Sequence, residues 1–344
     1  MSYLKWMTVL VGIFLLASCD NSFKSDIPLE PELPYEAMAL SPESEVVDMS
    51  FSTDFSTQAA AALPDLNDTA GRAVAFEYTF SNGEKVNYMV QDGVVASGDM
   101  LLTHYNTLKN AVVDYENIIA DGGGGTPSSI SPQAAITKKY CKTRVLFCFD
   151  YDGDKWPNGV VTYEIPPATQ FSAAEFQMIK DVMKEISTNT SNKITFKVGT
   201  SGDRIRFRST GSGCNSWLGR AGGAQTINLT RSEGCITKAL MRHEIGHALG
   251  FIHEHQRFDR DNYVTVNYNN IKSGKKDQFQ KFNTSNLGII SGYDFNSVMH
   301  YSGSLFSKDP GKLYTIIRTR TGKPTDYIYV YSRTDYEYMR RYYP

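Results

Sequence analysis

The sequence predicts an α+β fold in which a sheet with long helices is followed by a more irregular C-terminal part. Three observations favour this class. Residues 193–198 and 204–208 alternate apolar and polar side chains, as half-buried strands do. Residues 171–187 carry apolar side chains at helical spacing, and a later segment bears two histidines four residues apart. The chain has 344 residues, which is long enough for two domains on a prior of about 150 residues each.

The composition describes an ordinary globular protein. Apolar residues make up 41% of the chain, and the formal net charge is −2. This balance favours neither a nucleic acid nor a strongly charged partner, so we expect no nucleic-acid binding. The sequence has no internal repeat, and we expect a monomer.

The N-terminus has the features of an export signal. Lys5 precedes an apolar run from Met7 to Leu16, which is too short to span a bilayer and suits a signal-peptide core. The following Ala-Ser-Cys completes a pattern typical of a bacterial lipobox, so residues 1–19 are predicted to be a lipoprotein signal with Cys19 as the lipidated residue. The alternative is a plain secretory signal in which Cys19 is incidental. We expect an exported protein that contacts the membrane only through this lipid, or a cell-surface form released after processing.

Two segments of biased composition separate the N-terminus from the main folded part. Residues 20–50 are rich in proline, serine and acidic side chains, which is typical of a tether. Residues 74–80 and 85–90 resemble strands around the turn Ser81-Asn82-Gly83, so residues 51–120 are predicted to be moderately ordered. The stretch DGGGGTPSSISP begins at Asp121 and predicts a flexible linker, where proteolysis is easiest.

The main folded part is predicted to begin with a strand over Val160–Ile165, preceded by the turn Trp-Pro-Asn-Gly. The helix over residues 171–187 starts with Ser172 and Glu175 in a capping-box pattern. Four apolar residues share one face of this helix: Ile179, Val182, Met183 and Ile186.

Residues 243–253, HEIGHALGFIH, predict a zinc site. His243 and His247 share one face of a helix, where two imidazoles can hold one Zn²⁺ at about 2.0–2.1 Å each. Glu244 is placed to take a proton from water on the metal. Gly250 lets the chain turn sharply after the helix, so that His253 can reach the same ion. An HExxH pattern alone also occurs by chance on amphipathic helices, but the added glycine and third histidine favour the metal site.

The residues after this motif resemble the astacin family of metzincins. Residues 243–261 are similar to the astacin pattern HExxHxxGFxHExxRxDRD, and SVMHY at 297–301 is similar to the family's Met-turn. Ser332 and Asp335 resemble the start of its short closing helix. The resemblance covers about residues 141–344. It implies a two-lobed catalytic domain with a cleft between the lobes, behind a pro-segment at 51–120 and a linker with the activation region at 121–140.

The resemblance also implies residue roles. Glu244 would be the general base, Tyr301 would bind the zinc at rest and stabilise the oxyanion, and Met299 would form an apolar floor beneath the metal. Glu254 would receive the new N-terminal ammonium after activation. The zinc ligands would be His243, His247 and His253, which hold one Zn²⁺ per catalytic domain.

Two further histidines lie close to this motif in the sequence. His255 replaces a residue that is usually glutamine in the family, and we expect it to be solvated. His300 is expected to be a packed turn residue rather than a ligand.

Cysteine use suits an exported protein. Without Cys19, four of the five cysteines remain, and the sequence alone allows three pairings. The resemblance implies a Cys214–Cys235 disulfide. The other usual family disulfide needs a cysteine near the C-terminus, and none follows Cys235. We therefore expect a local Cys141–Cys148 bridge instead.

Residues 94–102, VVASGDMLL, resemble the pro-segment motif FxGD, although Ala96 replaces the aromatic residue. The resemblance implies that Asp99 occupies the position of the catalytic water on the zinc and keeps a zymogen inactive. A carboxylate is a good zinc ligand, and Gly98 would allow a close approach of the backbone. Two alternatives are a simple Gly-Asp turn between strands and a thiolate from Cys141 or Cys148 on the metal.

Two classes of function remain open. The first is a secreted zinc endopeptidase that hydrolyses protein or peptide substrates and is made as a zymogen. The second is a non-catalytic surface lipoprotein that keeps the metal site for folding or binding. Glu244 favours the enzyme, because a non-catalytic site has no need of a base. Specificity depends on the loops around residues 303–320, and their composition selects no substrate residue.

Overall fold

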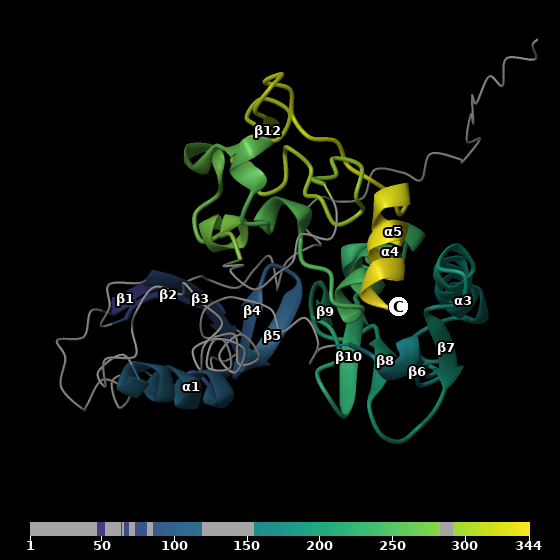
Figure 1. The fold of residues 1–344 in the computed structure, drawn as a ribbon. Helices are drawn as coiled ribbons and strands as arrows, with labels where there is room; N and C mark the ends of the chain where they lie inside the picture. Colours follow the sequence, from purple (N-terminus) through teal and green to yellow (C-terminus); the bar gives the residue numbers. More distant parts are fainter. Residues whose placement is uncertain are drawn as a thin grey trace, which may run out of the picture. The chain divides into compact units, whose positions relative to one another are not determined.

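The computed structural model describes residues 47–51, 63, 65–68, 73–80, 85–118, 155–282 and 292–344 (Figure 1). The predicted signal with Cys19, the linker, and the expected Cys141–Cys148 bridge lie outside the described residues. The predicted turn at 81–83 does as well. Among the described residues, no helix is both long and apolar enough to cross a membrane.

A mixed sheet of ten strands runs through the described chain, with the order β1-β2-β3-β4-β5-β9-β10-β8-β6-β7 (Figure 1). Five strands come from the upstream part of the chain: β1 (Val47–Phe51), β2 (Ala73–Thr79), β3 (Lys85–Gln91), β4 (Val94–Ser97) and β5 (Met100–His104). The other five come from the downstream part: β6 (Val160–Tyr163), β7 (Thr195–Val198), β8 (Arg204–Arg208), β9 (Cys214–Trp217) and β10 (Ala224–Leu229). The sheet and its helices confirm the predicted α+β class.

The two groups of strands meet at β5 and β9, which pair in parallel. Ser216 N donates to Asp99 O at 2.9 Å, and Leu218 N donates to Leu101 O at 3.0 Å. Two backbone hydrogen bonds therefore fix the position of Asp99 along β9. No pattern in the sequence predicted this pairing.

The upstream part has an apolar core of its own. Helix α1 (Tyr105–Ile118) follows β5 directly and contacts both β4 and β5. Phe76 lies 5.4 Å from Tyr88 and 6.4 Å from Tyr105 between ring centroids, and all three side chains are buried. Leu108 and Val112 of α1 are buried as well. Strands β2 and β3 confirm the two strands predicted here.

The first elements of the downstream part follow the sequence closely. Helix α3 (Ala173–Asn189) begins with a complete capping box, in which Ser172 N donates to Glu175 and Glu175 N donates to Ser172 Oγ. Its four predicted apolar residues are all buried. Strand β8 has its predicted bounds, whereas β6 ends at Tyr163, two residues before the predicted end.

The remainder contains α4 (Lys238–Ala248), the small antiparallel pair β11 (Val264–Val266) and β12 (Ile316–Arg318), and the closing helix α5 (Arg333–Tyr342). Short 3-10 turns are frequent: η3 (Pro157–Gly159), η4 (Arg231–Glu233), η5 (Glu254–Gln256), η6 (Arg260–Asn262), η7 (Tyr268–Asn270) and η8 (Lys276–Phe279). A buried cluster that includes Phe279 of η8, Tyr301 and Phe306 forms the apolar core of this part. After α4, the described chain has only two short strands, 3-10 turns and the closing helix α5, so this part is irregular, as expected from the sequence.

Candidate metal centre and active site

Helix α4 places the first two histidines on one face. Thr237 caps the helix by accepting a hydrogen bond from Leu240 N, and both histidines lie on the last turns. The rings of His243 and His247 are 4.6 Å apart between centroids. Gly250 has a φ of 103°, a conformation that favours glycine, and the chain then returns to bring His253 alongside. All three imidazoles are buried.

Each imidazole is oriented by a partner at Nδ1. His243 Nδ1 donates to Val298 O at 2.8 Å, and His247 Nδ1 donates to Phe251 O at 2.6 Å. His253 Nδ1 lies 2.9 Å from Gln256 Oε1. The first two acceptors are carbonyl oxygens, and the third is an amide oxygen, so Nδ1 carries the proton on each ring. The Nε2 lone pairs are therefore free to bind a metal.

The three Nε2 atoms converge on one point. His243 Nε2 lies 3.1 Å from His247 Nε2 and 3.2 Å from His253 Nε2. Two nitrogens bound to one tetrahedral zinc at about 2.0–2.1 Å lie about 3.3 Å from each other. Unprotonated nitrogens repel at this distance unless a cation lies between them. The donor set and its spacing thus fit a zinc ion.

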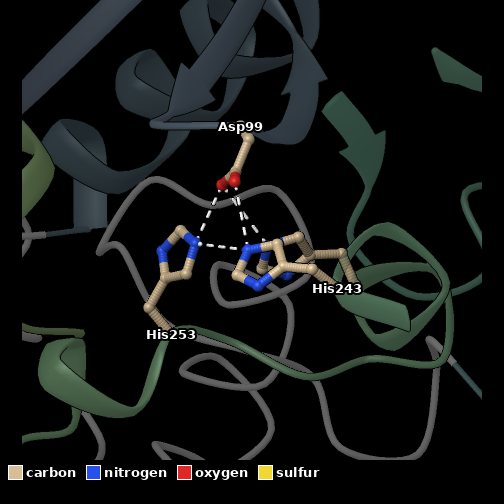
Figure 2. A group of neighbouring side chains, drawn as sticks. Asp99, His243 and His253 are labelled. Atoms are coloured by element: carbon tan, nitrogen blue, oxygen red, sulfur yellow. Dashed lines mark hydrogen bonds and ion pairs between the residues drawn. The ribbon is translucent and has the colours of Figure 1, made fainter. Parts of the chain in front are cut away.

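Asp99 closes the site from the opposite side (Figure 2). Asp99 Oδ2 lies 3.1 Å from His243 Nε2, and Oδ1 lies 3.3 Å from His247 Nε2 and 2.8 Å from His253 Nε2. The ligand atoms of the four residues lie within 4.8 Å of one another. Burial by itself would raise the pKa of Asp99, but positive charge among the three imidazoles, His253 foremost, holds it well below its usual range, and a bound zinc ion would supply that charge. The Gly-Asp turn predicted as an alternative is present, and it also delivers a carboxylate to the metal site.

Glu244 lies beside the first ligand with its carboxylate fully buried. Neither of its oxygens has a hydrogen-bond partner among the described residues. Burial raises the pKa of Glu244 well above its usual range, and the negative charge of Asp99 raises it further. A buried carboxyl group with no partner has both oxygens available for proton transfer to or from a bound molecule.

Tyr301 and Met299 lie on the turn after residue 296. The Tyr301 hydroxyl is buried without a partner among the described residues, and its ring packs 4.3 Å from His253 between centroids. Burial raises the pKa of Tyr301 well above its usual range, with a further contribution from Asp99. A Cβ added to Gly246 would lie 2.7 Å from Met299 Sδ, so Met299 packs directly against α4 between the two ligand turns.

Asp335 anchors this turn, a contact that the sequence did not reveal. Ser297 Oγ donates to Asp335 Oδ1 at 2.6 Å, and Val298 N donates to Oδ2 at 3.2 Å. The same carboxylate completes the capping box of α5 with Ser332. Because Val298 O holds His243, the closing helix supports a metal ligand through the turn.

The structure contradicts the expectation for His255 and agrees with that for His300. The expectation of a solvated His255 is wrong, because the ring is fully buried and stacks 4.1 Å from the ring of Tyr301. Turn η5 directs this side chain inward, where Phe279 covers it at 5.5 Å. His300 lies in a packed turn as expected: Nε2 is 2.7 Å from the Tyr293 hydroxyl, and Nδ1 donates to Tyr301 O.

Glu254 is mostly buried, and its Oε1 accepts hydrogen bonds from Asp294 N at 2.8 Å and from Arg257 at 3.1 Å. Burial raises the pKa of Glu254 to about 8, although Arg257 opposes the shift. The Cys214–Cys235 disulfide is present and ties β9 to the segment before α4, as the family resemblance implied.

Two glutamines next to the metal site were also missed. Gln256 binds His253 and donates through Nε2 to Ser97 Oγ at 2.9 Å and to Gln278 O at 3.1 Å. Gln278 is fully buried beside Gly98. Gln256 stands at an unspecified position of the pattern over residues 243–261, and Gln278 lies outside that pattern, so the pattern marks neither residue.

Comparison with known proteins agrees with this geometry. The protein-family profile for astacin, which describes a family of peptidases, matches residues 149–344. Over 176 residues, or 51% of the chain, the sequence is 35% identical to the astacin-like metalloprotease toxin 1 of Loxosceles intermedia, of which 64% is covered. Over 181 residues, again 51% of the chain, it is 36% identical to the low choriolytic enzyme of Oryzias latipes, of which 65% is covered.

A solved structure is also similar to this chain. It is that of high choriolytic enzyme 1, a hatching enzyme zinc-protease from the same fish, with 34% sequence identity and a TM-score of 0.49. The match covers 55% of this chain and 92% of the solved chain. The chain covers less than two thirds of the length of the toxin and of the low choriolytic enzyme.

Proposed function

Because the chain belongs to the astacin family of peptidases, we propose that it is a zinc-dependent endopeptidase made as an inactive precursor. One observation carries the proposal. Three Nε2 atoms converge at 3.1–3.2 Å next to a buried glutamate that has no partner among the described residues. This arrangement combines a metal site with a proton acceptor, which peptide hydrolysis by activated water requires.

His243, His247 and His253 would hold the zinc, with their Nδ1 partners keeping the rings in place. When bound, zinc supplies Lewis acidity toward a peptide carbonyl and lowers the pKa of a water molecule. Glu244 would take a proton from the attacking water and return it to the leaving amine nitrogen. The Tyr301 hydroxyl would donate a hydrogen bond to the carbonyl oxygen as negative charge develops there.

The precursor would be inactive because Asp99 occupies the side of the metal site that substrate must approach. The position of its carboxylate, within 3.3 Å of all three Nε2 atoms, supports this role. Pairing of β5 with β9 holds the blocking turn in place. We assign residues 51–120 to the pro-segment, 121–140 to the linker that contains the activation region, and 141–344 to the catalytic domain. After cleavage, Glu254 would receive the new N-terminal ammonium, a role suited to its mostly buried carboxylate.

We further propose that the protein is exported and lipidated at Cys19. The apolar run of residues 7–16 and the Leu-Ala-Ser-Cys pattern that follows support this location. Protein or peptide substrates would then be encountered outside the cytoplasm, and the membrane would be contacted only through the lipid.

Casein hydrolysis tests the proposed activity. The purified precursor is treated with a protease that cuts between residues 121 and 155, and the rate is measured before and after cleavage. We expect activity only after cleavage, its loss with 1,10-phenanthroline, and its return with added zinc. A processed protein that binds one zinc and hydrolyses neither casein nor gelatin would contradict the proposal and favour a binding role for the metal site.

A further inference from the structure

Gln278 has a side chain with no visible use in the precursor. It lies on η8 and is fully buried, yet neither its amide nitrogen nor its amide oxygen has a hydrogen-bond partner among the described residues. Buried amides without partners are rare in folded proteins, because the lost hydrogen bonds to water are not replaced. An unpartnered amide of this kind is explained if it forms hydrogen bonds in another state of the protein, such as the cleaved enzyme with a bound substrate.

The unpartnered amide faces the turn that carries Asp99. A Cβ added to Gly98 would lie 3.4 Å from Gln278 Oε1, 2.6 Å from the Tyr301 hydroxyl and 3.4 Å from His253 Cε1. The amide, the phenol and a metal ligand therefore border one small space. In the precursor, the main chain at Gly98 fills it.

The backbone of Gln278 is firmly held at this border. Its carbonyl oxygen accepts hydrogen bonds from His255 Nε2 and from Gln256 Nε2, both at 3.1 Å. The next residue, Phe279, is buried and packs edge-on against Tyr301 at 6.0 Å between ring centroids. The partners named here all belong to the downstream part of the chain, although β3 of the upstream part also contacts η8.

We propose that Gln278 binds the main chain of the peptide substrate beside the reacting carbonyl after the pro-segment has left. This inference rests on the proposed endopeptidase function. A side-chain amide offers one acceptor and a donor group, which match the N–H and C=O of a peptide unit. The space that it faces holds polypeptide main chain in the precursor, and a substrate backbone takes that place in the active enzyme. Tyr301 meets the developing charge, whereas Gln278 pairs with neutral peptide groups.

The variant Gln278→Met tests this role, because methionine has a similar length and no hydrogen-bonding amide. In the processed enzyme we expect KM for a fluorogenic peptide to rise about threefold to tenfold, as for one or two uncharged hydrogen bonds, with little change in kcat. In the precursor we expect an unchanged or higher Tm, because the amide has no partner to lose there. Lys276→Met, an exposed change on the same turn, serves as the control.

Three outcomes would overturn the proposal: an unchanged KM, a fall in kcat alone, or a precursor with a lowered Tm or zinc content. Gln278→Leu is measured in parallel, so that a folding defect peculiar to methionine does not decide the result. Binding of a peptide hydroxamate and of acetohydroxamate separates this inference from the proposed function. Even if the processed wild type hydrolyses nothing, the variant should bind the peptide hydroxamate more weakly and acetohydroxamate equally well. Equal binding of both would overturn the role of Gln278.

Discussion

The two sides of the metal site are supported in different ways. On the histidine side, every ligand has an acceptor at Nδ1, from Val298 O, Phe251 O or Gln256 Oε1. On the opposite side, neither oxygen of Asp99 has a hydrogen-bond partner among the described residues, and the carboxylate lies against the three imidazoles. The histidines would keep their arrangement without the aspartate. Asp99 is held by the backbone hydrogen bond from Ser216 N to its carbonyl oxygen, and its carboxylate would be held by the metal ion that the histidines bind.

This difference suits a permanent site with a removable ligand. Partners beyond the metal ligands fix ring orientation and strengthen metal binding, and under the proposed activation they would remain after the pro-segment has left. A carboxylate with its own hydrogen bonds would have to break them on release, and Asp99 has none to break among the described residues. The predictions below test this division, beginning with the largest expected effect.

Glu244→Gln tests whether the histidine side contains the reactive machinery. The amide cannot accept the proton, so we expect kcat of the processed enzyme to fall by about 10²–10⁴-fold. Zinc content should stay at one ion per chain, because Glu244 makes no contact that orients a ligand among the described residues. Peptide hydrolysis and metal analysis on the same sample provide the measurement. Near-normal turnover by a zinc-loaded variant would place the base elsewhere.

Asp99→Ala tests whether the Asp99 carboxylate keeps the uncleaved precursor inactive. We expect the uncleaved precursor to gain peptidase activity by about tenfold or more over wild type, since the carboxylate no longer competes at the metal. After cleavage, both proteins should be equally active. Asp68→Ala, which removes an exposed carboxylate in the upstream part, is the control and should remain inactive until cut. A folded, uncleaved Asp99→Ala protein as silent as wild type would shift latency from the Asp99 carboxylate to the main chain at Gly98, or to a thiolate from Cys141 or Cys148.

Gln256 lies between His253 and Ser97 in a row of hydrogen bonds. The variants Gln256→Leu and Ser97→Ala test which of these two residues supports zinc binding. Gln256 orients His253, so its loss should weaken zinc binding by about 10–100-fold. Ser97 touches Gln256 from the pro-segment side, and its loss should leave zinc affinity within about twofold. Competition with a zinc-binding dye gives both affinities. Equal losses in the two variants would mean that the pro-segment also supports the ligands.

Removal of zinc should increase local opening at the Asp99 turn more than in helix α4. Removing zinc with 1,10-phenanthroline takes away what holds the Asp99 carboxylate, while the Nδ1 hydrogen bonds of the histidines remain. We expect faster amide hydrogen exchange over residues 98–101 of the precursor and little change in α4. Mass spectrometry with and without the chelator measures this. A larger increase in α4 than at residues 98–101 would reverse the comparison.

Asp335 carries the smallest predicted effect, and it concerns stability. Burial raises the pKa of Asp335 to about 6, although hydrogen bonds from Ser297, Ser332 and Val298 oppose the shift. The folded state then binds the proton more tightly than the unfolded state, so the contribution is complete below about pH 4 and is lost as the pH rises through 6. Relative to Asp335→Asn, the free energy of unfolding of wild type should fall by about 1–3 kcal/mol from pH 4 to pH 6.5. Urea unfolding at several pH values checks the slope, and parallel curves would exclude the shift.

Features encoded by local spacing could be predicted from the sequence. The capping box at Ser172 and Glu175 starts α3, and the alternation of residues 204–208 marks β8. The four-residue step from His243 to His247, with the glycine turn at residue 250, predicts the converging imidazoles. Each of these signals lies within a few residues, because helices and strands repeat with fixed periods. A zinc site on an α+β scaffold was therefore determined by the sequence alone.

Only the tertiary structure decided which distant residues complete the site. Pairing of β5 with β9 sets the backbone of Asp99 beside Ser216, more than a hundred positions later, and no local pattern encodes that register. Packing of η5 and η8 against Tyr301 buries His255 and aims the amide of Gln278 at Gly98. Burial, and with it the pKa shifts of Glu244 and Asp335, arises from elements that meet across the chain. Those contacts depend on long-range packing, which periodicity and composition do not record.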